Sequence, residues 1–247
     1  MNTERHFIEV SGIRVEVVRK AIKNLHLGVY PPAGHVRVAV PERLDDEAVR
    51  LAVTSRLGWI RRKQQELQRQ PRQSRRELVT GESHYVWGNR YRLEVLEARQ
   101  RPGIEYAPGR RLRMVVRPGA DREKRERLLN EWYRAQLKAK IPGLIAKWEP
   151  ELGVGVAEWG VKRMRTRWGT CNPEAARIWI NLELAKKPPQ CLEYVIVHEM
   201  VHLLERKHDE RFRKLMDNAL PQWRALKQRL ESEPLAFEEW ESRSMSR

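Results

Sequence analysis

The chain has 247 residues and a formal net charge of +16, with 40% apolar and 33% charged residues. This apolar content is too high for a disordered protein, and no apolar stretch approaches the ~18 residues of a membrane span. The two cysteines, Cys171 and Cys191, form no CxxC pattern, which argues against a disulfide framework or a cysteine-based zinc site. Because the first residues are charged and lack an apolar signal segment, we expect a cytoplasmic protein with no membrane contact.

The large positive charge has two interpretations of about equal weight. It favours nucleic acid, anionic membrane surfaces or acidic proteins as partners, or it is a generic solvated surface. The basic run at residues 61–76 contains no aromatic side chain on which bases could stack. For this run we therefore favour a solvated helix end over a phosphate-binding surface.

Residues 1–118 are predicted to be rich in β-structure. A helix should interrupt this region, beginning after Asp45 or Asp46 and continuing toward Pro71. We expect no internal repeat. The strands are predicted where apolar and polar residues alternate between turn residues, at 13–18, 36–40, 91–95 and 112–116.

The rest of the chain, residues 119–247, is predicted to begin with a long linking helix over 121–148, which has an apolar stripe. Residues 177–184 alternate apolar and polar side chains, which is typical of a strand. Helices are expected at 191–205 and 209–220. The sequence therefore predicts an α+β fold in which the β-rich region comes first and the linking helix leads to a second domain.

One short motif carries chemistry, because His198-Glu199-Met200-Val201-His202 matches HExxH. The two histidines are four residues apart on the predicted helix, so both can reach one metal ion. Zinc suits imidazole, and catalytic zinc sites combine three protein ligands with a water. Glu199 lies beside the metal, where it can take a proton from that water and pass it to a leaving amine. We therefore predict a zinc-dependent hydrolase with one Zn²⁺ per chain, and we favour a peptidase.

The third ligand is predicted to be His208, which a sharp turn through residues 203–207 would bring back over the helix. The metzincin pattern HExxHxxGxxH has the same histidine spacing, but it has a glycine where this chain has Glu205. Glutamate does not readily adopt the conformation that glycine allows, so the turn should differ. The rival ligands are the acids Glu205, Glu231, Glu233, Glu238 and Glu239.

Three segments together resemble the YgjP-like metallopeptidases, which are relatives of the SprT-like and Spartan zincin proteases. These segments are RMRTRWGTC at 163–171, RIWINLEL at 177–184 and LEYVIVHEMVHLLERKHDERF at 192–212. The β-rich front half and the long helix also resemble the layout of that family, so the similarity covers most of the chain. The matching residues are Arg167, Trp168, Gly169, Cys171, His198, Glu199, His202, His208 and Phe212.

The resemblance implies a zincin-like C-terminal domain that binds one zinc ion through the three histidines, with Glu199 as the catalytic acid and base. In zincins, a strand before the active-site helix pairs with extended substrate, and residues 177–184 are the matching element. Related Spartan proteins cleave proteins crosslinked to DNA. The similarity is clearest around the metal, so it does not carry that substrate over to this chain.

The basic segment before Cys171 has a functional and a structural interpretation. An arginine of this segment could bind a substrate carboxylate or stabilise an oxyanion, or Trp168 could simply pack a loop whose arginines pair with surface acids. Cys171 is not expected to be a nucleophile, because the metal already supplies hydroxide. The candidate substrate-binding residues are Arg165, Arg167, Trp168 and Trp179.

Several functions remain open at this point. The first is a zinc peptidase or another amide hydrolase that acts on a protein or peptide. The second is a DNA-associated protein with a structural zinc site, for which a closed set of four ligands would be expected. A protease recruited by DNA would combine the two, and a toxin or accessory factor that acts on one partner protein is a third class.

Overall fold

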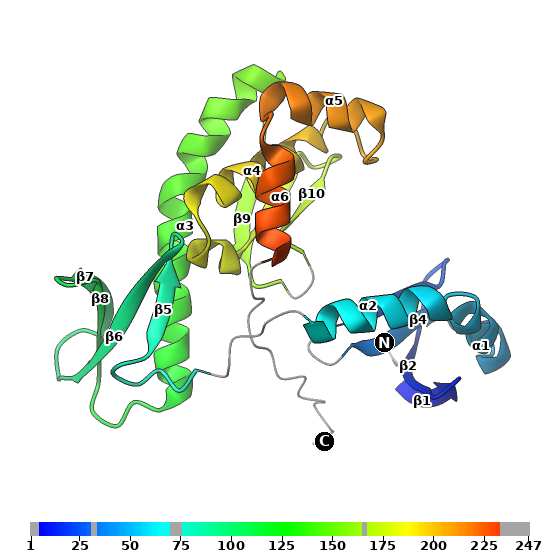
Figure 1. The fold of residues 1–247 in the computed structure, drawn as a ribbon, viewed down its shortest axis with the longest axis horizontal. Helices are drawn as coiled ribbons and strands as arrows, with labels where there is room; N and C mark the ends of the chain where they lie inside the picture. The colour runs from blue at the N-terminus through cyan, green and yellow to red at the C-terminus, as the bar shows by residue number, and fades with distance from the viewer. Residues whose placement is uncertain (1–4, 31–33, 70–75, 165–166, 233–247) are drawn as a thin grey trace. The chain divides into compact units, whose positions relative to one another are not determined.

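The computed structural model describes residues 5–30, 34–69, 76–164 and 167–232 (Figure 1). The chain divides into two compact units, residues 1–75 with 233–247 and residues 76–232. The described residues form a mixed α/β structure with three small sheets and six α-helices. The domain boundary expected at residue 118 therefore falls inside the second unit, between a sheet and the helix that follows it.

The first unit is a four-stranded sheet with two helices, and its apolar core contains side chains from both. The strands lie in the order β1-β2-β4-β3, where β2 and β4 are parallel and the two other pairs are antiparallel. The elements are β1 (Arg5–Val10), β2 (Ile13–Lys20), β3 (His26–Tyr30), β4 (His35–Pro41), α1 (Asp46–Thr54) and α2 (Leu57–Arg69).

The single helix predicted after residue 45 is in fact two helices. Asp45 caps α1 by accepting a hydrogen bond from the Ala48 N–H. The helix then ends at Thr54, and the hydroxyl of the next residue, Ser55, donates to the Ala52 carbonyl. Such local side-chain bonds compete with continued helix, and α2 begins two residues later. Val53 and Ile60, on either side of this turn, are both fully buried in the core of the unit.

The second unit begins with a sheet of β5 (Ser83–Val86), β6 (Asn89–Glu97), β7 (Gly103–Ala107) and β8 (Arg111–Val116). The order β5-β6-β8-β7 and the strand directions are the same as in the first unit. The unit continues through α3 (Arg122–Leu152), β9 (Glu158–Lys162), β10 (Gly169–Asn172), β11 (Arg177–Asn181), the 3-10 helix η1 (Leu182–Lys186), α4 (Pro189–Val201), α5 (Glu210–Ala219) and α6 (Trp223–Ser232).

The two four-stranded sheets form an internal structural repeat, so the expectation of no repeat was wrong. The first two strands of each repeat are joined by a two-residue hairpin turn, Ser11-Gly12 in one and Trp87-Gly88 in the other. Both residues of each turn have positive φ. These backbone angles are typical of type I′ hairpins. Each repeat also ends with an aspartate that caps the next helix, Asp45 or Asp121. Both Gly88 and Asp121 lie 76 residues after their counterparts.

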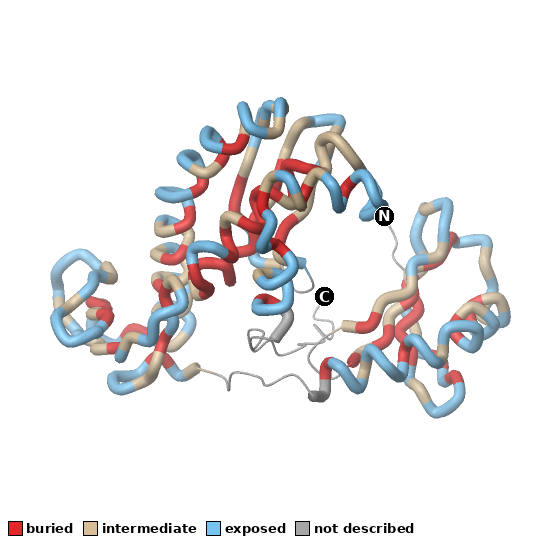
Figure 2. The backbone as a smooth tube through the Cα atoms, turned by 45° about the horizontal axis from the view of Figure 1, so that its top comes forward, coloured by how far each residue is buried: buried red, intermediate tan, exposed pale blue. Residues whose placement is uncertain are grey.

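Helix α3 matches the predicted linking helix and packs against the core of the second unit. Its buried positions recur every three or four residues, so one side of the helix packs into the core (Figure 2). Tyr133, on this side, donates its hydroxyl hydrogen bond to the Tyr85 carbonyl at 2.9 Å. The buried residues are Leu129, Tyr133, Leu137, Ile141, Ile145 and Trp148.

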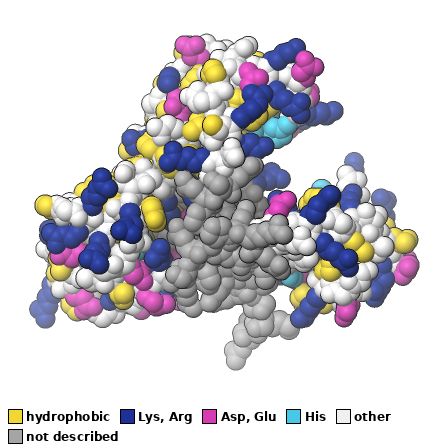
Figure 3. Space-filling view, viewed as in Figure 1, with side chains coloured by type: hydrophobic (Ala, Val, Ile, Leu, Met, Phe, Trp, Pro, Cys, Tyr) yellow, Lys and Arg dark blue, Asp and Glu magenta, His cyan; other side chains and the backbone are white. Residues whose placement is uncertain are grey.

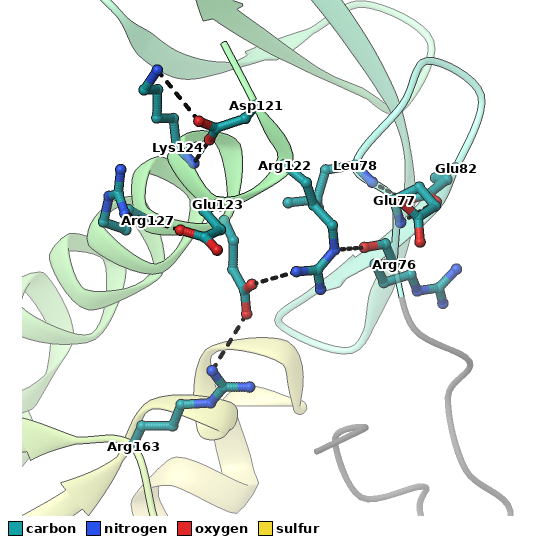
Figure 4. A network of polar contacts seen from close by, with 11 residues as sticks. Arg76, Glu77, Leu78, Glu82, Asp121, Arg122, Glu123, Lys124, Arg127 and Arg163 are labelled. Carbon is teal, nitrogen blue, oxygen red and sulfur yellow. Dashed lines mark hydrogen bonds and ion pairs between the residues drawn. The ribbon is translucent and has the colours of Figure 1, made fainter. Parts of the chain in front are cut away.

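A polar network attaches the first turns of α3 to the segment that follows β9 (Figure 4). Glu126 accepts hydrogen bonds from Arg122 at 3.1 Å and from Arg163 at 3.4 Å. Arg122 also donates to the Arg76 carbonyl at 2.8 Å. Three segments that are distant in sequence are thereby joined at the base of the loop that leads into β10.

Several boundaries in the C-terminal half differ from those predicted. The strand expected over 177–184 ends at Asn181, because this side chain accepts from the Glu183 N–H and starts η1. Helix α4 ends at Val201 rather than at residue 205. Helix α6 and the four-residue strand β10 were not predicted. Among the described residues, no helix is long and apolar enough to cross a bilayer.

The repeat offers a matched test of how the second sheet supports the rest of its unit. Backbone N–H groups of Trp87 and Gly88 donate to the carbonyls of Ala185 and Lys186 in η1. A Cβ added at Gly88 would lie 2.8 Å from Pro188 Cγ, whereas one added at Gly12 would meet nothing within 4 Å.

We therefore expect Gly88→Ala to destabilise more than Gly12→Ala. Both variants place alanine at positive φ, which lowers the free energy of unfolding by about 1–2 kcal/mol. Only Gly88→Ala adds a further loss from overpacking, of about 1–3 kcal/mol. Hydrogen-exchange mass spectrometry should show faster exchange in η1 and the start of α4 for Gly88→Ala. For Gly12→Ala the change should stay within the first unit, and equal effects of the two variants would contradict this account.

Candidate metal centre

Helix α4 carries the HExxH motif and is buried along most of its length. Its apolar residues fill the core of the second unit, and the motif faces a cleft. His198 and His202 are one helical turn apart and both are half-buried, with ring centroids 4.9 Å apart. Glu199, between them in sequence, is only 6% exposed.

The loop after α4 brings His208 to the same point. The imidazole nitrogens of His198, His202 and His208 lie within 4.8 Å of one another, and Nε2 of His198 is 3.1 Å from Nε2 of His208. Zinc–nitrogen bonds of 2.0–2.1 Å in a tetrahedron place two ligand nitrogens about 3.3 Å apart. The three side chains therefore have the chemistry and the spacing to hold a zinc ion.

Hydrogen bonding and packing orient these imidazoles. Nδ1 of His202 is 2.9 Å from the Glu205 carbonyl oxygen, so it donates there and leaves Nε2 with a lone pair. Phe212 packs against all three rings, with centroid distances of 4.6–5.0 Å. Nδ1 of His198 is buried and has no hydrogen-bond partner among the described residues.

The electrostatics of the centre favour neutral imidazoles. Burial, with smaller contributions from the neighbouring His202, His208 and Lys227, lowers the pKa of His198 to about 3. Burial also lowers the pKa of His208, with smaller contributions from His202 and Lys227. Neutral rings offer lone pairs to a metal ion, so the site is prepared for a cation at neutral pH.

Glu199 lies directly over Gly169, the first residue of β10. A Cβ at position 169 would be 2.6 Å from Glu199 Oε1 and 2.7 Å from Glu199 Cγ, so only glycine fits beneath this carboxylate. Burial raises the pKa of Glu199 to about 8, a net value that already includes the lowering effect of the positive charge of Arg167. A bound cation would lower it further.

Asn181, a residue that sequence reasoning did not identify, holds Met164, Arg167 and Trp168 ahead of β10. Its buried amide donates to the carbonyls of Met164 and Arg167 at 2.9 and 2.7 Å, and its carbonyl oxygen accepts from the Met164 N–H. Its backbone N–H also donates to the Trp168 carbonyl. Asn181 ends β11 and is buried, although the alternation of residues 177–184 places it with the polar side chains, so no signal in the sequence marked this role.

The predicted substrate-binding residues do not all lie together. Arg167 and Trp168 line the cleft beside Glu199. Trp179 is outside the cleft, because its ring covers Gly160 on the neighbouring strand and lies under Lys162 Nζ at 3.4 Å. Arg165 lies outside the described residues.

The rival ligands are placed differently from the histidines. The Glu205 carboxylate accepts from the Lys207 N–H and lies 3.8 Å from Arg211, so Glu205 acts on the centre through its backbone carbonyl. Glu205 is not among the five described non-glycine residues with positive φ, so the turn differs from one that needs glycine. The side chains of Glu231, Glu233, Glu238 and Glu239 lie outside the described residues.

The cleft has a volume of about 1120 Å³ and is bounded by β10, α4, α5 and α6. Residues 169–172 of β10 line it, and β10 is the edge strand of the sheet β10-β11-β9. The expectation that residues 177–184 pair with substrate was therefore wrong, because β11 is the central strand and both its edges are occupied. Among the described strands, none pairs with the outer edge of β10.

Cys171 lines the same cleft, but its surroundings keep it unreactive. Burial, and then the nearby Glu199, raise the pKa of the Cys171 thiol to about 11. The thiol is therefore protonated at neutral pH, and a protonated thiol is a poor nucleophile.

Comparison with known proteins agrees with this geometry. The profile of the YgjP-like metallopeptidase domain matches residues 23–233. The chain belongs to this family, and it is a metal-dependent peptidase. The crystal structure of the metallopeptidase zymogen of Pyrococcus abyssi abylysin aligns with a TM-score of 0.35 and 12% identity, over 38% of this chain and 99% of that chain. This structural likeness is too slight to support an argument. No curated protein matches the chain.

The contact between Gly169 and Glu199 can be tested directly. Gly169→Ala should displace the carboxylate and lower peptidase activity by about 100-fold or more, since a shift near 1 Å at a reacting group has this effect. Metal content should be unchanged, because the histidines are not touched. Gly155→Ala is the control, because a Cβ there meets nothing within 4 Å. Full activity of Gly169→Ala would show that the close approach has no catalytic importance.

Proposed function

We propose that this metal-dependent peptidase uses zinc, held by His198, His202 and His208, with Glu199 as the general base and acid. The observation that supports this most directly is the placement of a buried carboxylate beside three converging imidazoles at the wall of a cleft. A bound zinc ion would supply Lewis acidity, which lowers the pKa of a water and polarises the scissile carbonyl.

Glu199 performs the proton transfers in this proposal. As a carboxylate, it accepts a proton from the attacking water, and it holds that proton in a site where burial favours the neutral acid. It then donates the proton to the leaving amine. Arg167, close enough to lower the pKa of Glu199, favours the ionised form at the start of the cycle.

Substrate would bind along the outer edge of β10. An extended peptide can add to a free sheet edge through backbone hydrogen bonds. Because Gly169 is both the first residue of β10 and the neighbour of Glu199, a peptide on this edge passes the carboxylate. This geometry supports an internal peptide bond as the substrate.

An open metal centre favours catalysis over a structural role. Among the described residues, the group that could hold a metal contains three histidines and no fourth ligand. Structural zinc sites are closed by four protein ligands, whereas catalytic sites leave one position for water. Nucleic-acid binding stays a prediction from charge, for which steep salt dependence of DNA binding is the test. Two free cysteines fit the proposed cytoplasmic location.

Three matched variants separate the roles in this proposal. Glu199→Gln should lower activity by about 10³-fold, as expected for loss of a general acid and base, and should keep one zinc per chain. His208→Gln should weaken zinc binding by about 100-fold or more. Glu205→Gln, a carboxylate in the same loop, should change neither activity nor zinc content.

The measurements are elemental analysis of zinc in the purified protein and cleavage of unfolded proteins by each variant. Activity in Glu199→Gln equal to that of the wild type would refute the proposed mechanism. Loss of zinc in Glu205→Gln, with zinc kept in His208→Gln, would instead assign the third ligand to the acid.

A further inference from the structure

The charged side chains that line the cleft are strongly biased toward positive charge. Besides Glu199, they comprise four basic residues and one acid. The single acid, Glu174, is already paired with Arg206 at 3.1 Å. The basic residues are Arg167, Arg206, Arg213 and Lys227.

These cations come from four separate segments. Arg167 precedes β10, Arg206 follows α4, Arg213 is on α5, and Lys227 is on α6. All four side chains are exposed. Figure 3 shows Lys and Arg side chains gathered beside histidine side chains on one face of the second unit. Among the described residues, no carboxylate lies within 4.0 Å of the guanidinium groups of Arg167 or Arg213.

The four cations line the same cleft as Glu199 and the three histidines, so their positive field acts on one site. A cleft with one sign of charge concentrates field and attracts ligands of the opposite sign. A bound zinc ion would add to this positive potential, because imidazole ligands bring no negative charge to offset it.

We propose that the cleft selects peptide segments with acidic side chains on either side of the scissile bond. The inference rests on the proposed peptidase function and adds the class of substrate to it. A peptide on the edge of β10 would pass between Arg167, at the β10 side, and Arg213 and Lys227, on the helices that bound the cleft. Acidic side chains would meet these cations, while lysine or arginine would be repelled.

The first experiment is cleavage of a proteome-derived peptide library by the zinc-loaded wild type, with Glu199→Gln as the inactive reference. Sequencing the products should show aspartate and glutamate enriched within a few residues of the cleaved bond. The best peptide is then resynthesised with glutamine or lysine in place of its acidic residues. We expect kcat/KM to fall about fivefold for glutamine and further for lysine, with smaller differences at about 0.5 M salt.

A matched pair of variants tests whether the cleft cations are responsible. Arg213→Glu reverses a charge that lines the cleft, whereas Lys214→Glu makes the same change one residue later on α5, outside it. Arg213→Glu should lower kcat/KM for the acidic peptide by about fivefold and raise it for the lysine peptide. Lys214→Glu should leave the ratio of the two substrates unchanged.

The outcomes separate this inference from the proposed function. If the wild type cleaves no peptide above the level of Glu199→Gln, the proposed function fails. If it cleaves peptides without acidic enrichment, or if both charge reversals shift the ratio equally, only the inference fails. A single-stranded oligonucleotide that inhibits the wild type but not Arg213→Glu, in the absence of any acidic preference, would assign the cations to nucleic acid instead.

Discussion

The close approach of the Glu199 carboxylate to Gly169 is the constraint on which the second unit depends. Burying a carboxylate is costly, and here it lies where any side chain at position 169 would collide with it. The separation of α4 and β10 must therefore be fixed closely. Asn181 holds the loop before β10, while η1, bonded to the Trp87-Gly88 turn, holds the start of α4. The catalytic geometry is thus set by elements far from it in sequence.

The duplicated sheet explains where this support comes from. Both repeats have the turn glycine and the capping aspartate. Glycine adopts positive φ without strain, and an aspartate side chain accepts a hydrogen bond from an otherwise unpaired N–H group at the start of a helix. Their strand residues differ, because a half-buried strand accepts many apolar side chains. For this reason the repeat could not be recognised from the amino-acid sequence, whereas the shared strand order of the two sheets shows it directly. In the second repeat the hairpin turn also contacts η1 and Pro188, a contact that has no counterpart in the part of the first repeat that the structure describes.

The sequence predicted structural features that depend on residues close together in the chain. It did not predict features that depend on contacts between distant residues. The helical spacing of His198 and His202, and the periodic apolar stripe of α3, follow from neighbours in sequence. The grouping of these histidines with His208 is as expected from the spacing, while their role as zinc ligands stays a prediction. The role of Asn181 in anchoring residues 164 and 167 could not be foreseen, because these hydrogen bonds join residues 14 to 17 positions apart in the sequence. The position of Trp179 could not be foreseen either, because it depends on Gly160 in the adjacent parallel strand.

The basic residues of the cleft would connect the proposed role of Glu199 with the proposed class of substrate. Burial raises the pKa of Glu199 to about 8 even though Arg167 acts to lower it, so the carboxyl group is largely protonated near neutral pH. A general base must be ionised when water attacks the substrate, so further positive charge is needed, and a bound metal ion would supply it. Imidazole ligands carry no negative charge, so they would leave the charge of a metal ion uncompensated, and the cations around them add to it. An acidic substrate would supply the missing negative charge, so the positive field that favours ionised Glu199 would also favour the ligand that balances it.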